Sequence, residues 1–299
     1  MKTEINKKER VKKRALGYLH SNDSSLYKTA TISLSVKGYI LVSIIKLPCR
    51  HNAKLKLLVD EVNRDEKLQA YWKCVNVAAI DRMGFSDHGP IHVKIVANSA
   101  LKLLRLLVES GVTPNIVKDY GLINEDAEVI VFLASVMHDL GMAVVRERHE
   151  EYSALLALGF LQKYLEPVYP QDQAAIVTTE VLHVLISHHR QQHPLTLEAG
   201  VVRVADALDM EKGRARIPFE AGKINIHSIS ALSIENVEIK KGTEKPVTIK
   251  IKMSNSAGIF QVDELLKGKI QGSGLEKYIH VVAEITGERE RKIIERFEI

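Results

Sequence analysis

The sequence contains little cysteine. Cys49 and Cys74 are the only two in 299 residues, too few for a disulfide framework or for a zinc site made of thiolates. We therefore expect a reducing, cytoplasmic location. Long apolar runs are also lacking: no segment reaches the roughly 18 consecutive apolar residues of a membrane span, so no membrane partner is expected. The apolar fraction of 45% is nonetheless large enough to build a hydrophobic core.

The excess of positive charge lies at the N-terminus. The formal net charge is +5, and residues 1–14 contain seven Lys or Arg against two Glu, so the rest of the chain is balanced. Basic leaders of this kind are usually solvated. We interpret residues 1–79 as this leader, a short hairpin around residues 32–37, where apolar and polar residues alternate, and a helical lead-in over residues 55–79.

Residues 80–216 predict helices almost throughout. After Pro90, apolar residues recur at intervals of three or four, which is typical of an amphipathic helix. His92 lies on this apolar face, and His88, four residues earlier, is expected to share it. These histidines therefore point toward the core, where a polar group is costly unless something pairs with it.

A second helix is predicted to be buried on nearly all sides. Val129–Met137 is apolar except for one serine, and His138 and Asp139 follow directly. We expect Gly141 to cap this helix. The helix would thus deliver an imidazole and a carboxylate at one end.

Two later helices are predicted to carry polar residues in the same way. In the first of these helices, apolar residues at helical spacing end next to His188. Thr196 is the expected N-cap of the second, which would run through Met210. Asp206 and Asp209 would then lie one turn apart on that helix.

The pattern changes in residues 217–299. Val237–Lys240, Val247–Met253 and Tyr278–Ile285 predict strands, and Ile259–Lys269 predicts a helix. We interpret this part as a smaller α+β module.

The histidines are concentrated in the middle part of the chain. Eight of the twelve lie between His88 and His193. Imidazole and carboxylate bind divalent transition metals, and a carboxylate can bridge two such ions. The order of these groups predicts a binuclear centre of two divalent ions (Mn, Fe, Ni, Co or Zn). The candidate ligands are His88, His92, His138, Asp139, His149, His188, His189 and Asp206.

With these residues in view, the middle part resembles the HD superfamily of metal-dependent phosphohydrolases. The residues that match its core signature are His92, His138-Asp139 in His-Asp-Leu-Gly, and Asp206 in Val-Ala-Asp-Ala-Leu-Asp. The resemblance implies that these four bind a first metal ion. It also implies a mainly α fold, an HD-domain helical bundle, to which the C-terminal α+β module is added.

Further residues are similar to those of binuclear members of the superfamily. His149, His188 and His189 match the additional histidines of those members, in which Asp139 would bridge the two ions. The stretch is also similar to the HD-GYP branch, which hydrolyses cyclic dinucleotides. In that branch a ligand can precede the first histidine by four residues, the position of His88.

Two departures separate the chain from the HD-GYP pattern. The Gly-Tyr-Pro motif does not follow His189, and Met142 replaces the lysine that closes the His-Asp-x-Gly-Lys signature. Both departures disfavour cyclic dinucleotides as substrates. The phosphate contact made by that lysine is left without an assigned residue.

The predicted chemistry is hydrolysis of a phosphomonoester or phosphodiester, with a nucleotide as the expected substrate. Two neighbouring cations lower the pKa of a water molecule, and the hydroxide that results attacks phosphorus. The candidate catalytic residues are Asp139, Asp209, which would orient a ligand or assist proton transfer, and Arg190. Guanidinium groups bind phosphate oxygens in pairs. The candidates for this contact are Arg146, Arg148, Arg190, Arg214 and Arg216.

Two other functions remain open at this stage. One is a non-catalytic or regulatory HD protein that retains metal and binds a partner, a nucleotide or a nucleic acid. The other is an oxygenase with a di-iron pair. The expected partner is a small phosphorylated substrate, while nucleic-acid binding and homo-oligomer formation stay undecided.

Overall fold

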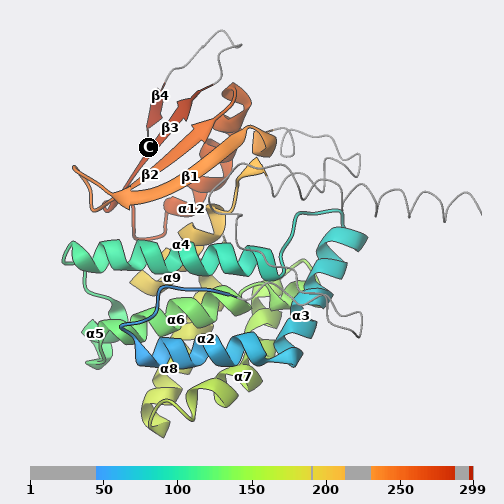
Figure 1. Ribbon diagram of the computed structural model, residues 1–299, viewed down its shortest axis with the longest axis vertical. Helices are drawn as coiled ribbons and strands as arrows, with labels where there is room; N and C mark the ends of the chain where they lie inside the picture. The colour runs from blue at the N-terminus through green and yellow to red at the C-terminus, as the bar shows by residue number, and fades with distance from the viewer. Residues whose placement is uncertain (1–44, 190, 213–229, 287–295, 299) are drawn as a thin grey trace, which may run out of the picture. The chain divides into compact units, whose positions relative to one another are not determined.

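The computed structural model describes residues 45–189, 191–212, 230–286 and 296–298. The described part is mainly helical and includes one small sheet (Figure 1), so the predicted fold class is confirmed. None of the described helices combines the length and the apolar character needed to cross a bilayer. The predicted hairpin around residues 32–37 lies outside the described residues.

The helical part precedes the sheet in the chain. Its α-helices are α2 (Ala53–Arg64), α3 (Glu66–Asn76), α4 (Pro90–Glu109), α5 (Asn115–Tyr120), α6 (Asn124–Met137), α7 (His149–Leu165), α8 (Gln171–Ser187) and α9 (Leu197–Ala207). Two shorter helices connect them: the π-helix η1 (Val77–Arg82) and the 3₁₀ helix η2 (Leu140–Ala143).

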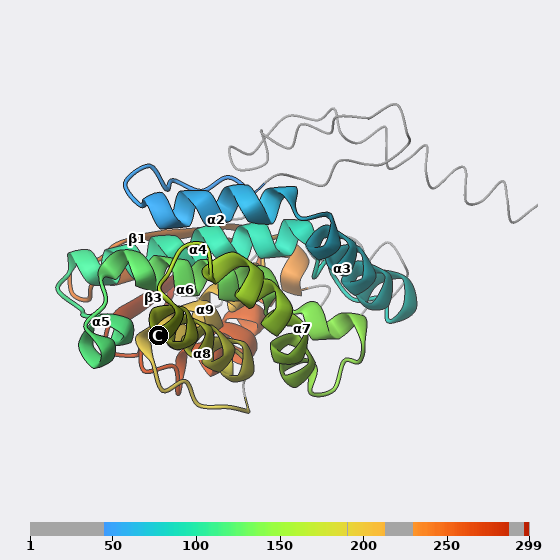
Figure 2. The same ribbon diagram turned by 90° about the horizontal axis from the view of Figure 1, so that it is seen from below.

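Helix α6 forms the centre of the bundle. Every residue from Asp126 to Met137 is buried, as expected for a helix that is apolar on all faces. It contacts α2, α4, α5, α7, α8 and α9, and Figure 2 shows it among α2, α4, α8 and α9. The C-terminal end of α6 therefore lies in the interior of the bundle, and His138 and Asp139 follow directly after it.

Three local predictions are wrong in detail. Helix α4 begins at Pro90 with Gly89 as its N-cap, so His88 lies in the preceding loop rather than on the helix. Helix α9 ends at Ala207, which places Asp209 beyond it. Gly141 does not cap α6, because it lies inside the 3₁₀ helix η2 that follows. The predicted N-cap of α9 is confirmed, since the Thr196 hydroxyl accepts a hydrogen bond from the Ala199 amide at 3.3 Å.

The described strands form one sheet in the order β1-β2-β3-β4. The strands are β1 (Ile234–Lys241), β2 (Val247–Met253), β3 (Ile279–Ile285) and β4 (Arg296–Glu298). The pairs β1–β2 and β3–β4 are antiparallel, whereas β2–β3 is parallel. Alternate residues of β2, from Val247 to Met253, are buried, as expected for a strand with one face toward a core.

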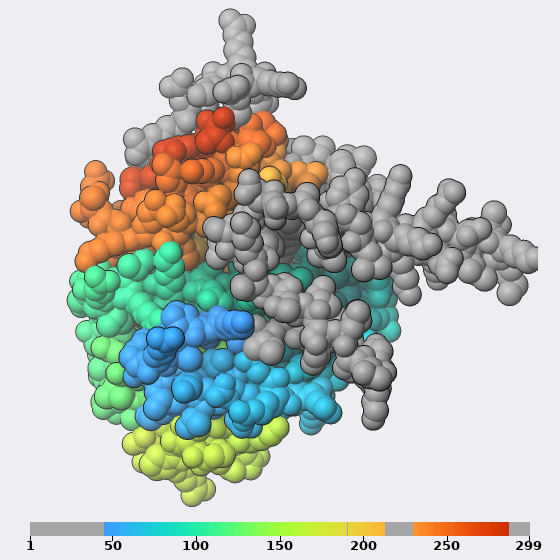
Figure 3. Space-filling view, viewed as in Figure 1, coloured from blue at the N-terminus to red at the C-terminus, as the bar shows by residue number. Residues whose placement is uncertain are grey.

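The parallel pair requires a crossover between β2 and β3. Its described helical elements are the 3₁₀ helix η3 (Ser256–Gly258), the π-helix η4 (Gln261–Lys267) and the short helix α12 (Gly268–Ile270). Both η4 and α12 contact α9, and β1 and β2 contact α4. Figure 3 shows the orange segments of the sheet against the green segment of α4. The crossover therefore brings part of the α+β module to the helix that carries Asp206.

Candidate metal centre

Four buried imidazoles meet where four helices of the bundle end or begin. His92 lies in the first turn of α4, and His149 is the first residue of α7. His138 and His188 are the residues directly after α6 and α8. All four side chains are at most 4% exposed. Four polar rings in one buried place need partners of their own.

Each of these rings has the same orientation. Its Nδ1 atom faces an oxygen acceptor outside the cluster, and its Nε2 atom faces inward. The Nδ1 acceptors are Asp209 Oδ2 for His92 (2.6 Å), Ser135 O for His138 (2.9 Å), Arg146 O for His149 (3.0 Å) and Leu185 O for His188 (2.7 Å). A carbonyl or carboxylate oxygen can only accept, so Nδ1 carries the hydrogen and donates it. A neutral ring then presents the lone pair of Nε2 to the interior, as in metal-binding histidines.

The Nε2 atoms approach one another closely. His92 Nε2 lies 3.0 Å from His138 Nε2, and His149 Nε2 lies 3.3 Å from His188 Nε2. Two nitrogen lone pairs repel each other at these distances unless a positive charge lies between them. The arrangement is therefore complementary to cations, either protons or metal ions.

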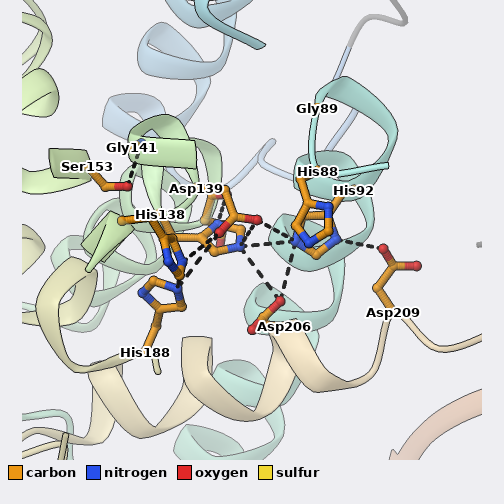
Figure 4. A network of polar contacts seen from close by, with 12 residues as sticks. His88, Gly89, His92, His138, Asp139, Gly141, Ser153, His188, Asp206 and Asp209 are labelled. Carbon is orange, nitrogen blue, oxygen red and sulfur yellow. Dashed lines mark hydrogen bonds and ion pairs between the residues drawn. The ribbon is translucent and has the colours of Figure 1, made fainter. Parts of the chain in front are cut away.

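The Asp139 carboxylate lies between the two pairs of imidazoles (Figure 4). Its Oδ2 atom is 3.4 Å from His92 Nε2 and 3.3 Å from His138 Nε2. Its Oδ1 atom is 3.3 Å from His149 Nε2 and 3.9 Å from His188 Nε2. One oxygen thus faces each pair, as a bridging carboxylate requires.

The donor atoms form two groups that could each hold a metal ion. His92, His138 and Asp206 make up the first group. Asp139, His149 and His188 make up the second. Within each group the ligand atoms lie within 4.8 Å of one another, and imidazole nitrogen with carboxylate oxygen suits divalent transition metals.

Gly141 allows the second group to form. A Cβ atom at this position would lie 2.0 Å from the His149 carbonyl oxygen and 2.7 Å from the Ser153 amide nitrogen. The Gly141 amide also donates to Ser153 Oγ at 2.8 Å, a contact that Figure 4 displays. The turn after Asp139 and the start of α7 can therefore approach closely only because position 141 has no side chain.

The charges in the site favour the metal-binding forms of Asp139, Asp206 and His188, whereas at His149 the Asp139 carboxylate outweighs burial and raises the pKa of the imidazole. Burial raises the pKa of Asp139, but the surrounding imidazoles lower it by more and hold it well below its ordinary value. Burial also raises the pKa of Asp206, and the Lys269 ammonium and two imidazoles outweigh this effect. Burial and neighbouring positive charges hold the pKa of His188 well below its usual range. Ionised carboxylates and a neutral imidazole are the states required for metal binding.

Lys269 belongs to this site, although no sequence pattern predicted it. Its Nζ atom donates to Asp206 Oδ2 at 2.9 Å and to the His188 carbonyl oxygen at 2.7 Å. Asp206 keeps its other oxygen, Oδ1, for the imidazoles of His92 (3.3 Å) and His138 (3.7 Å). A single lysine in a predicted helix 63 residues away carries no periodic or motif signal that would connect it to Asp206.

Glu150 was also not predicted from the sequence, and it contacts two of the predicted ligands. Its carboxylate lies 3.2 Å from His189 Nδ1 and 3.5 Å from His149 Nδ1. His189 lies beside the second group but outside it, with its ring centroid 5.8 Å from that of His149. His88 lies outside the first group in the same way, with its ring centroid 5.5 Å from that of His92 and its Nδ1 near the Ser86 carbonyl oxygen.

The predicted arginines lie in different surroundings. Arg146 is next to the second group, with Nη1 3.2 Å from His149 Nδ1. The Arg148 side chain is 75% exposed and pairs with Glu151. Arg190, Arg214 and Arg216 lie outside the described residues.

Position 142 does not present a polar group to the metal ligands. Met142 is 1% exposed. It packs in an apolar cluster with Val75 and Ala79. A lysine at this position would have to bury its charge among apolar side chains, which is costly.

Sequence comparisons identify the class to which this fold and donor set belong. Residues 91–211 match the HD domain, and the chain belongs to the HD superfamily, whose members are mostly metal-dependent hydrolases. The uncharacterized protein MJ1020 of Methanocaldococcus jannaschii is 44% identical over 244 residues, which cover 82% of this chain and 93% of that protein. The similarity therefore extends well beyond the HD domain.

A second relative has a described activity in its name. Ribonuclease Y of Desulforamulus reducens is 28% identical over 176 residues, or 56% of this chain. The aligned region spans only 30% of ribonuclease Y. The similarity thus concerns a part of that protein.

Proposed function

We propose that the protein is a phosphohydrolase that uses two divalent transition-metal ions to cleave a phosphomonoester or phosphodiester, with a nucleotide as substrate. The observation that carries the proposal is the position of Asp139 between two groups of donor atoms, with one carboxylate oxygen toward each. When bound, such ions supply a hydroxide nucleophile and stabilise charge on the phosphoryl oxygens.

The residues of the chain would prepare the site for this chemistry. The six donor atoms of the two groups would hold the ions, and Asp209 would fix the ring of His92 through its 2.6 Å contact with Nδ1. In Figure 4, Asp209 lies on the side of His92 away from Asp139, so it acts through the imidazole as a positioning residue. Of the arginines predicted to bind phosphate, Arg146 lies beside His149 of the second group, and we assign the phosphate contact to it.

Hydrolysis assays on the full chain test the proposal. The protein would be loaded in turn with Mn, Fe, Co, Ni and Zn and assayed with nitrophenyl phosphate, bis-nitrophenyl phosphate, nucleotides, cyclic dinucleotides and short RNA. RNA is included because part of ribonuclease Y is similar to 56% of this chain. We expect metal-dependent hydrolysis of at least one substrate, and a loss of more than about 100-fold in Asp139→Ala.

A matched control and an opposite outcome complete the test. Asp263→Ala removes an exposed carboxylate that pairs with Lys267, and its activity should equal that of the wild type. A protein that binds metal but hydrolyses none of these substrates would be a non-catalytic, regulatory HD protein, and the proposal would be wrong.

A further inference from the structure

We propose that Lys269 of the C-terminal α+β module binds the phosphate group of the substrate. This inference rests on the proposed phosphohydrolase function and adds a residue from outside the HD domain match, which ends at residue 211. Lys269 lies on α12, a part of the crossover that contacts α9.

Lys269 lies on a side of the site that solvent reaches. The Asp206 side chain is 19% exposed and that of Lys269 is 11% exposed. The other five members of the two metal-ligand groups are between 0% and 7% exposed. A substrate would therefore approach the metal ligands from the side of Asp206, where the ammonium group lies.

The ammonium group keeps one donor for a ligand. It carries three N–H groups, and its hydrogen bonds within the described part of the chain go to Asp206 Oδ2 and the His188 carbonyl oxygen. These two bonds fix the nitrogen directly beside a metal-ligand carboxylate. The third N–H can then point to an oxygen of a bound anion.

The buried side chain of Arg203 holds this part of the module in place. Arg203 is 1% exposed. Its guanidinium group donates to the carbonyl oxygens of Lys269 (3.0 Å), His189 (3.2 Å) and Gln192. The backbone of α12 is thereby tied to α9 and to the segment that follows α8.

A glycine on the same helix provides a second point of close contact. A Cβ atom at Gly200 would lie 2.3 Å from the Ser273 carbonyl oxygen. Helix α9 and the segment after α12 can therefore approach closely at this point. Lys269 is thus presented by a fixed backbone rather than by a free surface loop.

Bound metal ions would compete with Lys269 for the Asp206 carboxylate that now balances its charge. Two positive charges near each other in a partly buried site repel strongly. A lysine beside metal ligands therefore opposes metal binding unless negative charge enters the site with the substrate. Phosphate provides this charge, together with oxygen acceptors for the third N–H.

Three variants test this inference. Lys269→Met removes the charge at nearly constant volume, and Lys269→Arg keeps it. Lys267→Met is the matched control from the same segment, since Lys267 is 38% exposed and pairs with Asp263 at 2.8 Å. Each full-length, metal-loaded protein would be titrated with inorganic phosphate by calorimetry, and metal binding and thermal unfolding would be measured in parallel.

We expect Lys269→Met to bind phosphate about 10- to 100-fold more weakly than the wild type, the loss typical of one charged hydrogen bond. Its metal affinity should be equal or higher. Lys269→Arg should retain most of the phosphate affinity, and Lys267→Met should retain all of it. For a substrate that is hydrolysed, Lys269→Met should raise KM by a similar factor.

Two results would overturn the inference. One is unchanged phosphate affinity in Lys269→Met. The other is loss of metal from Lys269→Met with phosphate binding altered only as a consequence, which would make Lys269 a positioning residue for Asp206. Phosphate binding that depends on Lys269, in a protein that hydrolyses nothing, would instead reject the proposed hydrolase function and keep the phosphate site.

Discussion

At the scale of single residues, the site depends on which nitrogen of each imidazole faces inward. Three of the four rings are oriented by backbone carbonyl oxygens, with the Glu150 carboxylate also 3.5 Å from His149 Nδ1, whereas His92 is oriented by the side chain of Asp209. The carbonyl acceptors are part of the backbone and cannot be mutated away. Asp209 is therefore the residue through which ring orientation can be tested.

Replacement of Asp209 should weaken metal binding. Asp209→Ala removes the acceptor at 2.6 Å from His92 Nδ1, and loss of such a contact typically lowers metal affinity by about 10- to 100-fold. Asp209→Asn should have a smaller effect because an amide oxygen still accepts a hydrogen bond. Calorimetric titration with Zn or Mn measures the difference, and equal affinity in all three proteins would show that Asp209 does not orient the ring.

The sequence nominated much of the candidate site at this scale, but not all of it. All six members of the two donor groups are among the eight ligands that the sequence nominated, and each lies within about one turn of the start or end of a helix. Lys269 and Glu150 were not predicted, since their roles depend on contacts between distant residues that no sequence pattern indicates. His88 and His189 had suitable spacing, yet they lie just outside the groups.

At the scale of elements, the close approach of η2 and α7 positions the second donor group. Gly141→Ala should disturb this contact, because the new Cβ would lie 2.0 Å from the His149 carbonyl oxygen. We expect a loss of about 1–3 kcal/mol in the free energy of unfolding and weaker metal binding. Urea unfolding and metal titration would measure the two effects.

A second glycine provides the control for that experiment. Gly159 lies within α7 itself, and a Cβ atom there would meet no atom within 4 Å. Gly159→Ala should therefore leave the metal site intact and stabilise the protein by about 0.5–1 kcal/mol. If both variants behaved alike, the close contact at Gly141 would not be what positions His149.

The start of α3 predicts a dependence of stability on pH. The Asp65 carboxylate caps the helix through the Leu68 amide (3.0 Å) and accepts from Lys163 (2.8 Å) and Tyr164 (2.7 Å). Burial raises the pKa of Asp65, but these hydrogen bonds outweigh it, and the net pKa is lowered. Asp65→Ala should lower the free energy of unfolding by about 2 kcal/mol at neutral pH.

Because folding lowers the pKa of Asp65, the stability difference between the wild type and Asp65→Ala should disappear at low pH. A carboxyl group whose pKa is lowered by folding stabilises the native state above its unfolded pKa, about 3.9. This contribution is lost as the pH falls from that value through the lowered pKa of the folded protein. Urea unfolding at pH 7 and at pH values below 4 should therefore show a shrinking gap between the wild type and Asp65→Ala, whereas a constant gap would contradict the assignment.

Helix ends were harder to predict than helix faces. The apolar pattern of α6 correctly indicated a helix buried on nearly all sides. It could not reveal that Gly141 lets the start of α7 come close to η2, because this contact involves the backbone of residue 149. The same holds for the end of α9 at Ala207, which places Asp209 beyond the helix, where its carboxylate contacts His92 of α4.

At the scale of the whole molecule, two parts of the chain meet at one site. The HD domain supplies the two donor groups, and the crossover of the α+β module supplies Lys269. The sequence predicted three of the four described strands of the module and missed β4, and it contained no indication that the module reaches Asp206. Such contacts between distant segments are set by packing, here at Arg203 and Gly200, and not by local pattern.

The most direct test of the account is the number of metal ions that the folded protein binds. Elemental analysis of protein purified without oxygen and then loaded with Mn, Fe, Co, Ni or Zn should give two ions per chain, and Asp139→Ala should bind fewer. Bound metal should also raise the melting temperature, and a chelator should reverse this increase. A correctly folded protein that retains no ion under any of these loading conditions would contradict the account.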